Sequence, residues 1–412
     1  MTAAPIAYLT CEIKGRDLDG RSLIAAHLVK LGYAVVLGQY WNLKDNASTA
    51  PRGCYLFKTS NKIQADGMGI CKMPGHAIVA SDEEALSWSE DLAASTTDAQ
   101  TFQFCDRFLA LNAAHKRSLH RAFAKSADKV LVAGTARADL LRCAEYECPN
   151  ERPYVLFNTS FGLLNSVWGD VQKGIEVYAA GMRWDLNLPE PKAIMKARLD
   201  YEQASLRETR ALLDWLAPRT DVEIIVRPHP SENASWWRKH YGAHGGARIV
   251  ESSDALPWMQ HAKLMIHSDS TTGVEAAVMS TPTVNLSPLD AWANRLVLRR
   301  INYSVASAEG AHDAIEALLT TNTGPIADAA FNDPFPLDCA AASARAIASL
   351  LPPPGPVLPF EWRATPRTDV QTKKFTVSLE EFSASLARAF EIANHPTFRV
   401  RELTDSVVLV EP

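Results

Sequence analysis

Two short apolar runs that stop abruptly at polar residues place the strongest constraint on the fold. The first run, 222–226, leads into residues 227–232, and the second, 264–266, leads into residues 267–275. Runs of this length and composition predict buried strands of a parallel sheet. Open α/β sheets bind ligands at the carboxyl ends of their strands, and helix N-termini attract anions. The two runs therefore predict a phosphate-binding site.

Apolar runs alternate with amphipathic segments along most of the chain, which predicts an α/β fold of two Rossmann-like domains facing a central cleft. At 412 residues the chain is also too long for one ordinary core. In the N-terminal half, strands are expected at 6–13, 34–38, 54–58 and 76–80, and helices at 20–31 and 102–125. In the C-terminal half, a long helix is expected at 191–216, beginning at Pro191.

Two proline-containing segments divide the chain. Residues 148–153 are polar and contain two prolines, and residues 352–356 contain four prolines and a glycine. We therefore expect an N-terminal domain at 1–150 and a C-terminal domain at 151–351. Residues 352–412 are expected to form a linker and a last helix that packs back on the domains.

Composition excludes several classes of function. The net charge of −5, spread without charge blocks, gives no electrostatic reason to expect nucleic acid as a partner. We expect neither a signal peptide nor a transmembrane segment, since no apolar run approaches 20 residues, and hence a cytoplasmic protein. Seven cysteines without a Cys-x-x-Cys pair predict neither a disulfide framework nor a metal site. The oligomeric state stays open.

Arg227 and His229 are the sharpest candidates for chemistry. A guanidinium is permanently charged and has a donor fork suited to phosphate, and an imidazole can donate a hydrogen bond or a proton to a leaving phosphate. The prolines at 228 and 230 restrict the backbone and so stiffen the loop that presents both side chains. The alternative is a loop in which Arg227 only pairs with a neighbouring carboxylate.

Hydroxyl groups are concentrated after the second run. Capping of the following helix requires one hydroxyl, whereas this segment has four within five residues, Ser268, Ser270, Thr271 and Thr272. Glu275 either completes a capping box with Thr272 or accepts hydrogen bonds from ribose hydroxyls. The segment also contains His267, and Asn158 and Thr159 follow the expected first strand of the second domain. No Gly-x-Gly-x-x-Gly or Gly-x-x-x-x-Gly-Lys-Ser/Thr motif is present.

Acidic residues follow two strands of the N-terminal half. Glu12, Arg16 and Asp17 stand between the first strand and the first helix. We expect them to line the side of a cleft at which a second substrate, the acceptor, would bind. Glu83 and Glu84 follow the fourth strand. Paired carboxylates can raise one pKa and supply a general base. Acidic residues at a helix N-terminus, favoured by the helix dipole, explain them equally well.

Taken in order, these segments resemble bacterial surface-carbohydrate biosynthesis proteins of GT-B glycosyltransferase architecture. The resemblance extends over about residues 8–290, through Glu12 to Asp19, Gly38-Gln39, Ser81 to Glu84, Gly134 to Asp139, Asn158 to Gly162, Arg227 to Glu232, and His267 to Glu275. Three of these segments also look like the motifs of bacterial sialyltransferases and Kdo transferases, which use CMP-activated ulosonic acids.

The resemblance implies roles for individual residues. His229, with Arg227 and Ser231 beside it, would meet the CMP phosphate, and Ser268, Ser270 and Thr271 would meet the phosphate or the sugar carboxylate. Glu83 or Glu84 would be the base of an inverting reaction. Retaining Kdo transferases have an aspartate where this chain has Asn165, and an amide cannot be a nucleophile. Glu232 is then a second candidate nucleophile, and the stereochemical outcome stays open.

The sequence therefore predicts a metal-independent transferase that needs no cofactor and moves Kdo or a related sugar from a CMP-activated donor to a surface glycan. A lipid-linked glycan acceptor would add peripheral association with the inner membrane. The alternatives are a CDP-glycerol-type glycerophosphotransferase, a two-domain UDP-sugar 2-epimerase, and a non-catalytic component of polysaccharide assembly.

Overall fold

The computed structural model describes residues 5–87, 90, 93–143, 145–182, 184–242, 246–251, 254–289, 301–321, 335–395 and 397–412. The chain forms two compact units. Unit 1 comprises residues 1–86, 90–144 and 333–412, and unit 2 comprises residues 87–89 and 145–332.

Unit 1 is built on an eight-stranded sheet in the order β13-β14-β2-β1-β3-β4-β5-β6. Its strands are β1 (Ile6–Cys11), β2 (Ala34–Gln39), β3 (Gly53–Phe57), β4 (Ala77–Ser81), β5 (Arg107–Ala110), β6 (Val130–Val132), β13 (Arg399–Thr404) and β14 (Val407–Glu411). Strands β1 to β6 are parallel, and β14 adds to the edge strand β2 in antiparallel register. Because β1 lies between β2 and β3, the order reverses there, and the carboxyl ends of β1 and β3 form a topological switch point.

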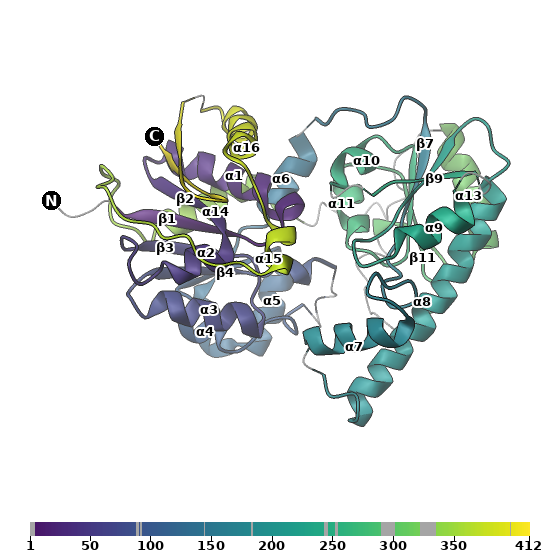
Figure 1. Ribbon diagram of the computed structural model, residues 1–412, viewed down its shortest axis with the longest axis horizontal. Coiled ribbons are helices and arrows are strands. Elements are labelled where there is room, and N and C mark those ends of the chain that lie inside the picture. The colour runs from purple at the N-terminus through teal and green to yellow at the C-terminus, as the bar shows by residue number, and fades with distance from the viewer. Residues whose placement is uncertain are drawn as a thin grey trace. The chain divides into compact units, whose positions relative to one another are not determined.

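Helices cover both faces of this sheet. The helices that precede the domain boundary are α1 (Lys14–Lys30), α2 (Tyr40–Asp45), α3 (Lys62–Lys72), η1 (Glu83–Ser87), α4 (Thr101–Phe104), α5 (Ala113–Ala122), η2 (Ala124–Lys129) and α6 (Ala136–Cys143). Those of the C-terminal segment are α14 (Cys339–Ala348), α15 (Asp369–Lys374) and α16 (Leu379–Ile392). Helices α6, α14 and α16 pack against α1, and Figure 1 shows the yellow C-terminal elements beside the purple N-terminal ones.

The return of the C-terminal segment to unit 1 rests on hydrogen bonds and apolar packing. Asp139 of α6 accepts hydrogen bonds from the first N–H groups of α14, those of Cys339 and Ala340, which stabilises a helix N-terminus. Trp362 stacks on Tyr8, whose ring stacks on Tyr55 with centroids 4.4 Å apart. The last strand and this aromatic stack thus complete the core of unit 1.

Unit 2 contains a six-stranded parallel sheet in the order β12-β11-β10-β7-β8-β9. Its strands are β7 (Tyr154–Asn158), β8 (Glu223–Arg227), β9 (Ala247–Ile249), β10 (Leu264–His267), β11 (Thr283–Leu286) and β12 (Tyr303–Val305). Its helices are α7 (Val171–Met182), α8 (Pro189–Leu216), α9 (Ala234–Tyr241), α10 (Leu256–Gln260), α11 (Thr272–Val278) and α13 (Ala308–Thr321). Here the order reverses at β7, so the switch point lies between the carboxyl ends of β7 and β10.

The prediction of two Rossmann-like α/β domains is confirmed, but one local prediction is wrong and two strands were missed. The helix expected at 102–125 is interrupted by β5, in which Phe108 to Ala110 are buried between β4 and β6. A short apolar run fits a buried strand and a buried helix equally well, and packing between two strands decided the outcome. Strands β13 and β14 were not predicted.

The observed division differs from the predicted domain boundaries in two places. The first unit ends at residue 144 and not at 150, and residues 333–351 belong to unit 1. The contacts of α14 with α1 and α6 explain the second difference.

Gly53 of β3 offers a test of the packing between β1 and β3. A Cβ atom at this position would lie 1.8 Å from the carbonyl oxygen of Ile6, whereas one at Gly20 in α1 would have 3.7 Å to its nearest neighbour. We expect Gly53→Ala to lower the free energy of unfolding by about 1–3 kcal/mol or more. The control Gly20→Ala should raise it by about 0.5–1 kcal/mol, because alanine favours the helix. Urea denaturation measures both, and equal effects of the two substitutions would contradict this register.

Candidate functional site

The carboxyl ends of β7, β8 and β10 bring the candidate residues of unit 2 together. Asn158 ends β7, Arg227 ends β8 directly beside it in register, and His267 ends β10. Parallel strands end at the same edge of a sheet, so the residues that follow them share that edge. Because β7 lies between β8 and β10, the two strand ends that the sequence singles out share one edge of the sheet but are not neighbours.

A chain of hydrogen bonds runs from Arg227 across the switch point. Its Nη1 donates to Oδ1 of Asn158 at 3.0 Å, and Nδ2 of Asn158 donates to Oγ1 of Thr272 at 2.8 Å. The Thr272 hydroxyl donates in turn to Oγ of Ser270 at 2.9 Å. Only 6% of Arg227 is exposed. The arrangement holds a permanent positive charge and two hydroxyls at the position where α/β sheets bind anions.

His229 is held as a neutral hydrogen-bond donor. The N–H of Ser231 donates to its Nδ1 at 3.1 Å, and Oγ of Ser231 lies 2.7 Å from the same nitrogen. An Nδ1 that accepts leaves the proton of the neutral ring on Nε2. The side chain reaches solvent, yet desolvation by surrounding protein, followed by the positive charges of Arg227 and Arg198, lowers its pKa to about 4. At neutral pH His229 therefore offers an N–H group without a charge.

Glu232 occupies a different environment from the one expected of a nucleophile. It is 4% exposed, and its Oε1 accepts from the Thr159 hydroxyl at 2.8 Å and from the N–H of His229 at 3.0 Å. Its Oε2 accepts from the indole N–H of Trp237 at 2.8 Å. Burial raises the pKa of this carboxyl, and the donors oppose that shift. These contacts favour a positioning role, in which Glu232 fixes the loop that presents His229.

The loop that follows β7 is hydrogen-bonded to the loop that follows β8. The N–H of Val167 donates to the carbonyl of Ser231 at 2.9 Å, and Nδ2 of Asn165 donates to the carbonyl of Asn233 at 3.1 Å. Gly162 packs so closely that an added Cβ would lie 2.2 Å from Oγ of Ser231. Asn165, at which the resemblance to retaining Kdo transferases implied an aspartate, thus joins two loops.

His267 organises the loop that follows β10. It is buried, accepts at Nδ1 from the N–H of Ser270 at 3.2 Å, and its Nε2 lies 2.9 Å from Oδ1 of Asn302. Asn302 also donates to the carbonyl of Gly273. A Cβ at Gly273 would lie 2.5 Å from the imidazole of His267, which explains the glycine there. Burial and these partners favour a structural role for His267 over direct contact with a ligand.

Asp269 belongs to this loop and was not among the predicted site residues. Its φ of +44° lies in the left-handed region, which aspartate tolerates better than most residues. Its carboxylate accepts hydrogen bonds from Tyr201 at 2.7 Å, from Asn285 at 2.8 Å and from Ser287 at 3.0 Å. Contacts with α8 and β11 therefore stabilise the turn that positions Ser270 and Thr272. These contacts are distant in sequence, so no local pattern reveals them.

The remaining predicted residues of unit 2 lie on the same loop and helix. Ser268 and Glu275 are buried, and Thr271 stands at the N-cap position of α11 without a side-chain capping bond. The capping-box alternative for Glu275 with Thr272 is therefore wrong, since Thr272 is already the first residue of α11.

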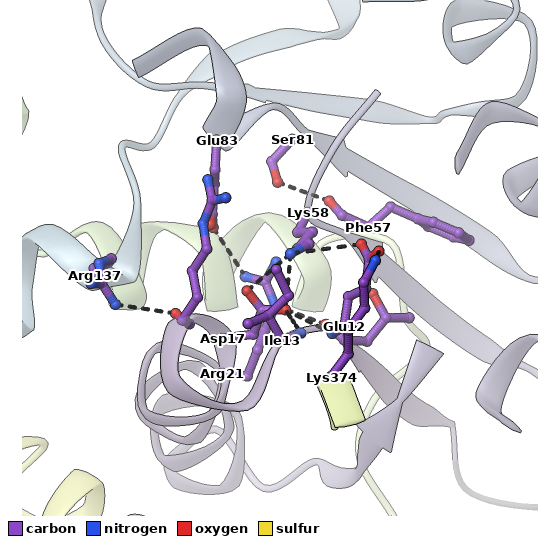
Figure 2. A network of polar contacts seen from close by, with 12 residues as sticks. Glu12, Ile13, Asp17, Arg21, Phe57, Lys58, Ser81, Glu83, Arg137 and Lys374 are labelled. Carbon is purple, nitrogen blue, oxygen red and sulfur yellow. Dashed lines mark hydrogen bonds and ion pairs between the residues drawn. The ribbon is translucent and has the colours of Figure 1, made fainter. Parts of the chain in front are cut away.

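The predicted acidic residues of unit 1 lie at its own switch point (Figure 2). Oδ2 of Asp17 accepts from the N–H groups of Glu12 and Ile13 at 2.7 and 2.8 Å, and Nζ of Lys58 lies 3.1 Å away. Burial raises the pKa of Asp17, but Lys58, these N–H groups and Arg21 outweigh it and hold the pKa below its usual value. Asp17 is thus the internal counter-ion of Lys58 and occupies the N-terminus of α1.

The other predicted residues of unit 1 surround this pair. Glu12 lies between Lys58 at 3.7 Å and Lys374 at 3.3 Å, and the carbonyl of Arg16 accepts from Arg137 at 3.4 Å. Oε1 of Glu83 lies 3.7 Å from Nη1 of Arg21. The side chain of Glu84 lies outside the described residues. Sequence reasoning missed both cations, Arg21 and Lys58, because single basic residues carry no motif.

The described part of the structure contains neither a metal-binding cluster nor a membrane-spanning helix. No three His, Cys, Asp or Glu side chains there are grouped so as to hold a metal ion. None of the described helices is long and apolar enough to cross a membrane.

No family model and no curated protein matches the chain. Among solved structures, it is similar to Staphylococcus aureus MnaA in a co-structure with UDP, at 13% identity and a TM-score of 0.50, over 82% of this chain and 94% of that one. It is also similar to Methanocaldococcus jannaschii UDP-GlcNAc 2-epimerase in complex with UDP-GlcNAc and UDP, at 13% identity and a TM-score of 0.52, over 84% and 99%. A further UDP-N-acetylglucosamine 2-epimerase matches at 12% identity and a TM-score of 0.51, over 85% and 96%.

These comparisons confirm the GT-B-like fold of two Rossmann-like domains. The prediction of a transferase that uses a CMP-activated ulosonic acid is wrong, because the similar structures are UDP-GlcNAc 2-epimerases. The expectations that depended on it, a Kdo donor and transfer to a surface glycan, are wrong as well. The residues that carry this resemblance have donors suited to a phosphate, and a phosphate does not identify the nucleobase.

The surroundings of Glu232 predict the outcome of removing its charge. Glu232→Gln places an NH2 group among donors, so we expect the free energy of unfolding to fall by about 1–3 kcal/mol. The control Glu223→Gln, at the partly exposed start of β8, the strand that precedes this loop, should change it by less than about 0.5 kcal/mol. Chemical denaturation measures both. If Glu232→Gln leaves the stability unchanged but abolishes turnover, the result would instead support the predicted role of Glu232 as a nucleophile.

Proposed function

We propose that this protein binds a UDP-N-acetylhexosamine, with the diphosphate at the carboxyl ends of β7, β8 and β10, and inverts the sugar at C2. The observation that carries the proposal is the buried chain from Arg227 through Asn158 to Thr272 and Ser270 at the switch point of unit 2. Solved 2-epimerases of similar fold, one of them bound to UDP-GlcNAc and UDP, support the choice of nucleotide and reaction.

The charges and donors of unit 2 suit a diphosphate. Arg227 brings a fixed positive charge that is largely shielded from water, where its interaction with an anion is stronger than in solvent. The Nε2–H of His229 adds a neutral donor, which can bind a phosphate oxygen over the whole neutral pH range because its pKa is about 4. Ser270 and Thr272 add hydroxyls. Arg227 and Asn158 are held in place before the ligand arrives, so binding requires little reorganisation.

Inversion at C2 replaces the hydrogen on one face of the sugar ring by a hydrogen on the opposite face. Elimination of UDP makes this feasible without an oxidant. The C1–O bond breaks and its electron pair leaves with UDP. At the same time a base takes the proton from C2, and a double bond forms between C1 and C2. Addition of UDP to C1 and of a proton to the opposite face of C2 restores the sugar. In both directions negative charge develops on the phosphate oxygen, where Arg227 and His229 would stabilise it. The reaction needs no glycan acceptor.

The proposal predicts exchange of the C2 hydrogen with solvent. In D2O, UDP-GlcNAc should gain deuterium at C2 and form its C2 epimer, both measured by proton NMR. Arg227→Gln should lower kcat/KM by about 100-fold or more, because it removes charge stabilisation from the leaving group. The matched control Arg207→Gln changes an exposed arginine of α8 paired with Glu208 and should have no effect.

A parallel thermal-shift series with UDP, CMP and GDP separates binding from chemistry. Stabilisation by UDP that is lost in Arg227→Gln supports the site. Stabilisation by CMP or GDP without UDP would contradict the uridine assignment, and UDP binding without deuterium exchange would contradict the reaction but not the site.

A further inference from the structure

Unit 1 has a second switch point, with its own buried cations, that the proposed function does not use. Residues that follow β1 and β3 meet there: Arg21 lies in the second turn of α1, and Lys58 directly follows β3. Both side chains are almost fully buried, at 5% and 3% exposure. Buried cations require compensation, so their partners decide whether the group is only structural.

Lys58 is compensated. Its ammonium group lies 3.1 Å from Asp17 and 3.7 Å from Glu12, and Asp17 in turn accepts two backbone N–H groups (Figure 2). Asp17 thereby uses its acceptors on Lys58 and on the start of α1. It has little capacity left for Arg21.

Arg21 is only partly compensated. Its Nε donates to the carbonyl of Thr10 at 3.2 Å, and its Nη1 lies 3.7 Å from Oε1 of Glu83, which is an ion pair but too long for a hydrogen bond. Its Nη2 is buried and has no hydrogen-bond partner among the described residues. Leaving a buried charged donor without an acceptor costs more than leaving a neutral one. A group with this arrangement is suited to an incoming anion.

We propose that Arg21, assisted by Lys58, binds an oxyanion of a ligand at the β1/β3 switch point, either a carboxylate or a phosphate group. Nη2 of Arg21 donates to the oxyanion, and Nη1 becomes available to it when Glu83 moves away. This subsite lies within unit 1 and does not depend on the function proposed for unit 2.

Glu83 acts as the exchangeable counter-ion of this subsite. The side chain of Glu83 is more exposed than that of Arg21. It also accepts a 3.4 Å hydrogen bond from the hydroxyl of Thr135. In the absence of ligand it neutralises Arg21 without saturating its donors. Removing the charge of Glu83 should therefore strengthen anion binding, whereas removing that of Arg21 should abolish it. A purely structural ion pair predicts no such opposite effects.

The experiment measures binding of inorganic phosphate and of acetate by isothermal titration calorimetry. All proteins are full-length and carry Arg227→Gln, so that anion binding in unit 2 does not contribute. We expect Arg21→Gln to weaken binding by about tenfold or more and Glu83→Gln to tighten it. The control Arg117→Gln, which removes an exposed arginine paired with Glu90, should leave it unchanged.

The two probes distinguish the chemical source of the anion. Tighter binding of acetate identifies a carboxylate ligand, to be followed with glucuronate, and tighter binding of phosphate identifies a phosphate ligand, to be followed with glucose 1-phosphate. Binding that survives in Arg21→Gln, or that does not tighten in Glu83→Gln, overturns the proposal. If Arg21→Gln fails to fold, the direction of the Glu83→Gln effect decides alone. Loss of anion binding on introducing Arg227→Gln alone would place the anion in unit 2, which overturns this subsite and leaves the proposed function intact.

Discussion

The buried carboxylate of Glu232 is the contact on which the geometry of unit 2 depends. It joins the residue after β7, the loop after β8 and the helix α9 through Thr159, the backbone of His229 and Trp237. A buried carboxylate is costly unless its oxygens are satisfied, and here donors from three segments satisfy them. Arg227 and His229 stand on either side of the first proline of that loop, so their positions follow from this contact.

Both sheets place cations where their strand order reverses, but they compensate them differently. In unit 2, Arg227 donates a hydrogen bond to a neutral amide, that of Asn158. In unit 1, Lys58 is neutralised by Asp17, whereas Arg21 faces Glu83 at a distance that leaves donors unused. The difference lies in the partners of each cation, because the cations themselves have equal charge and similar burial.

Features that depend on neighbouring residues in the sequence could be predicted, whereas features that depend on distant residues could not. The strand ends at Asn158, Arg227 and His267 follow from apolar runs and polar boundaries, and the structure places all three at one edge of the sheet, with β7 between β8 and β10. The roles of Glu232 and His267 depend on Trp237, Thr159 and Asn302, which are distant in sequence or carry no motif. The short strand β5 was hidden in an apparently helical segment. The nucleotide was mistaken because residues that bind phosphate carry no information about the base.

A crystal structure of the protein with UDP tests the proposed nucleotide site of unit 2 most directly. We expect the diphosphate at the carboxyl ends of β7, β8 and β10, with its oxygens within about 3 Å of the guanidinium of Arg227 and of Nε2 of His229. UDP bound at another place, or a diphosphate that contacts neither side chain, would contradict it.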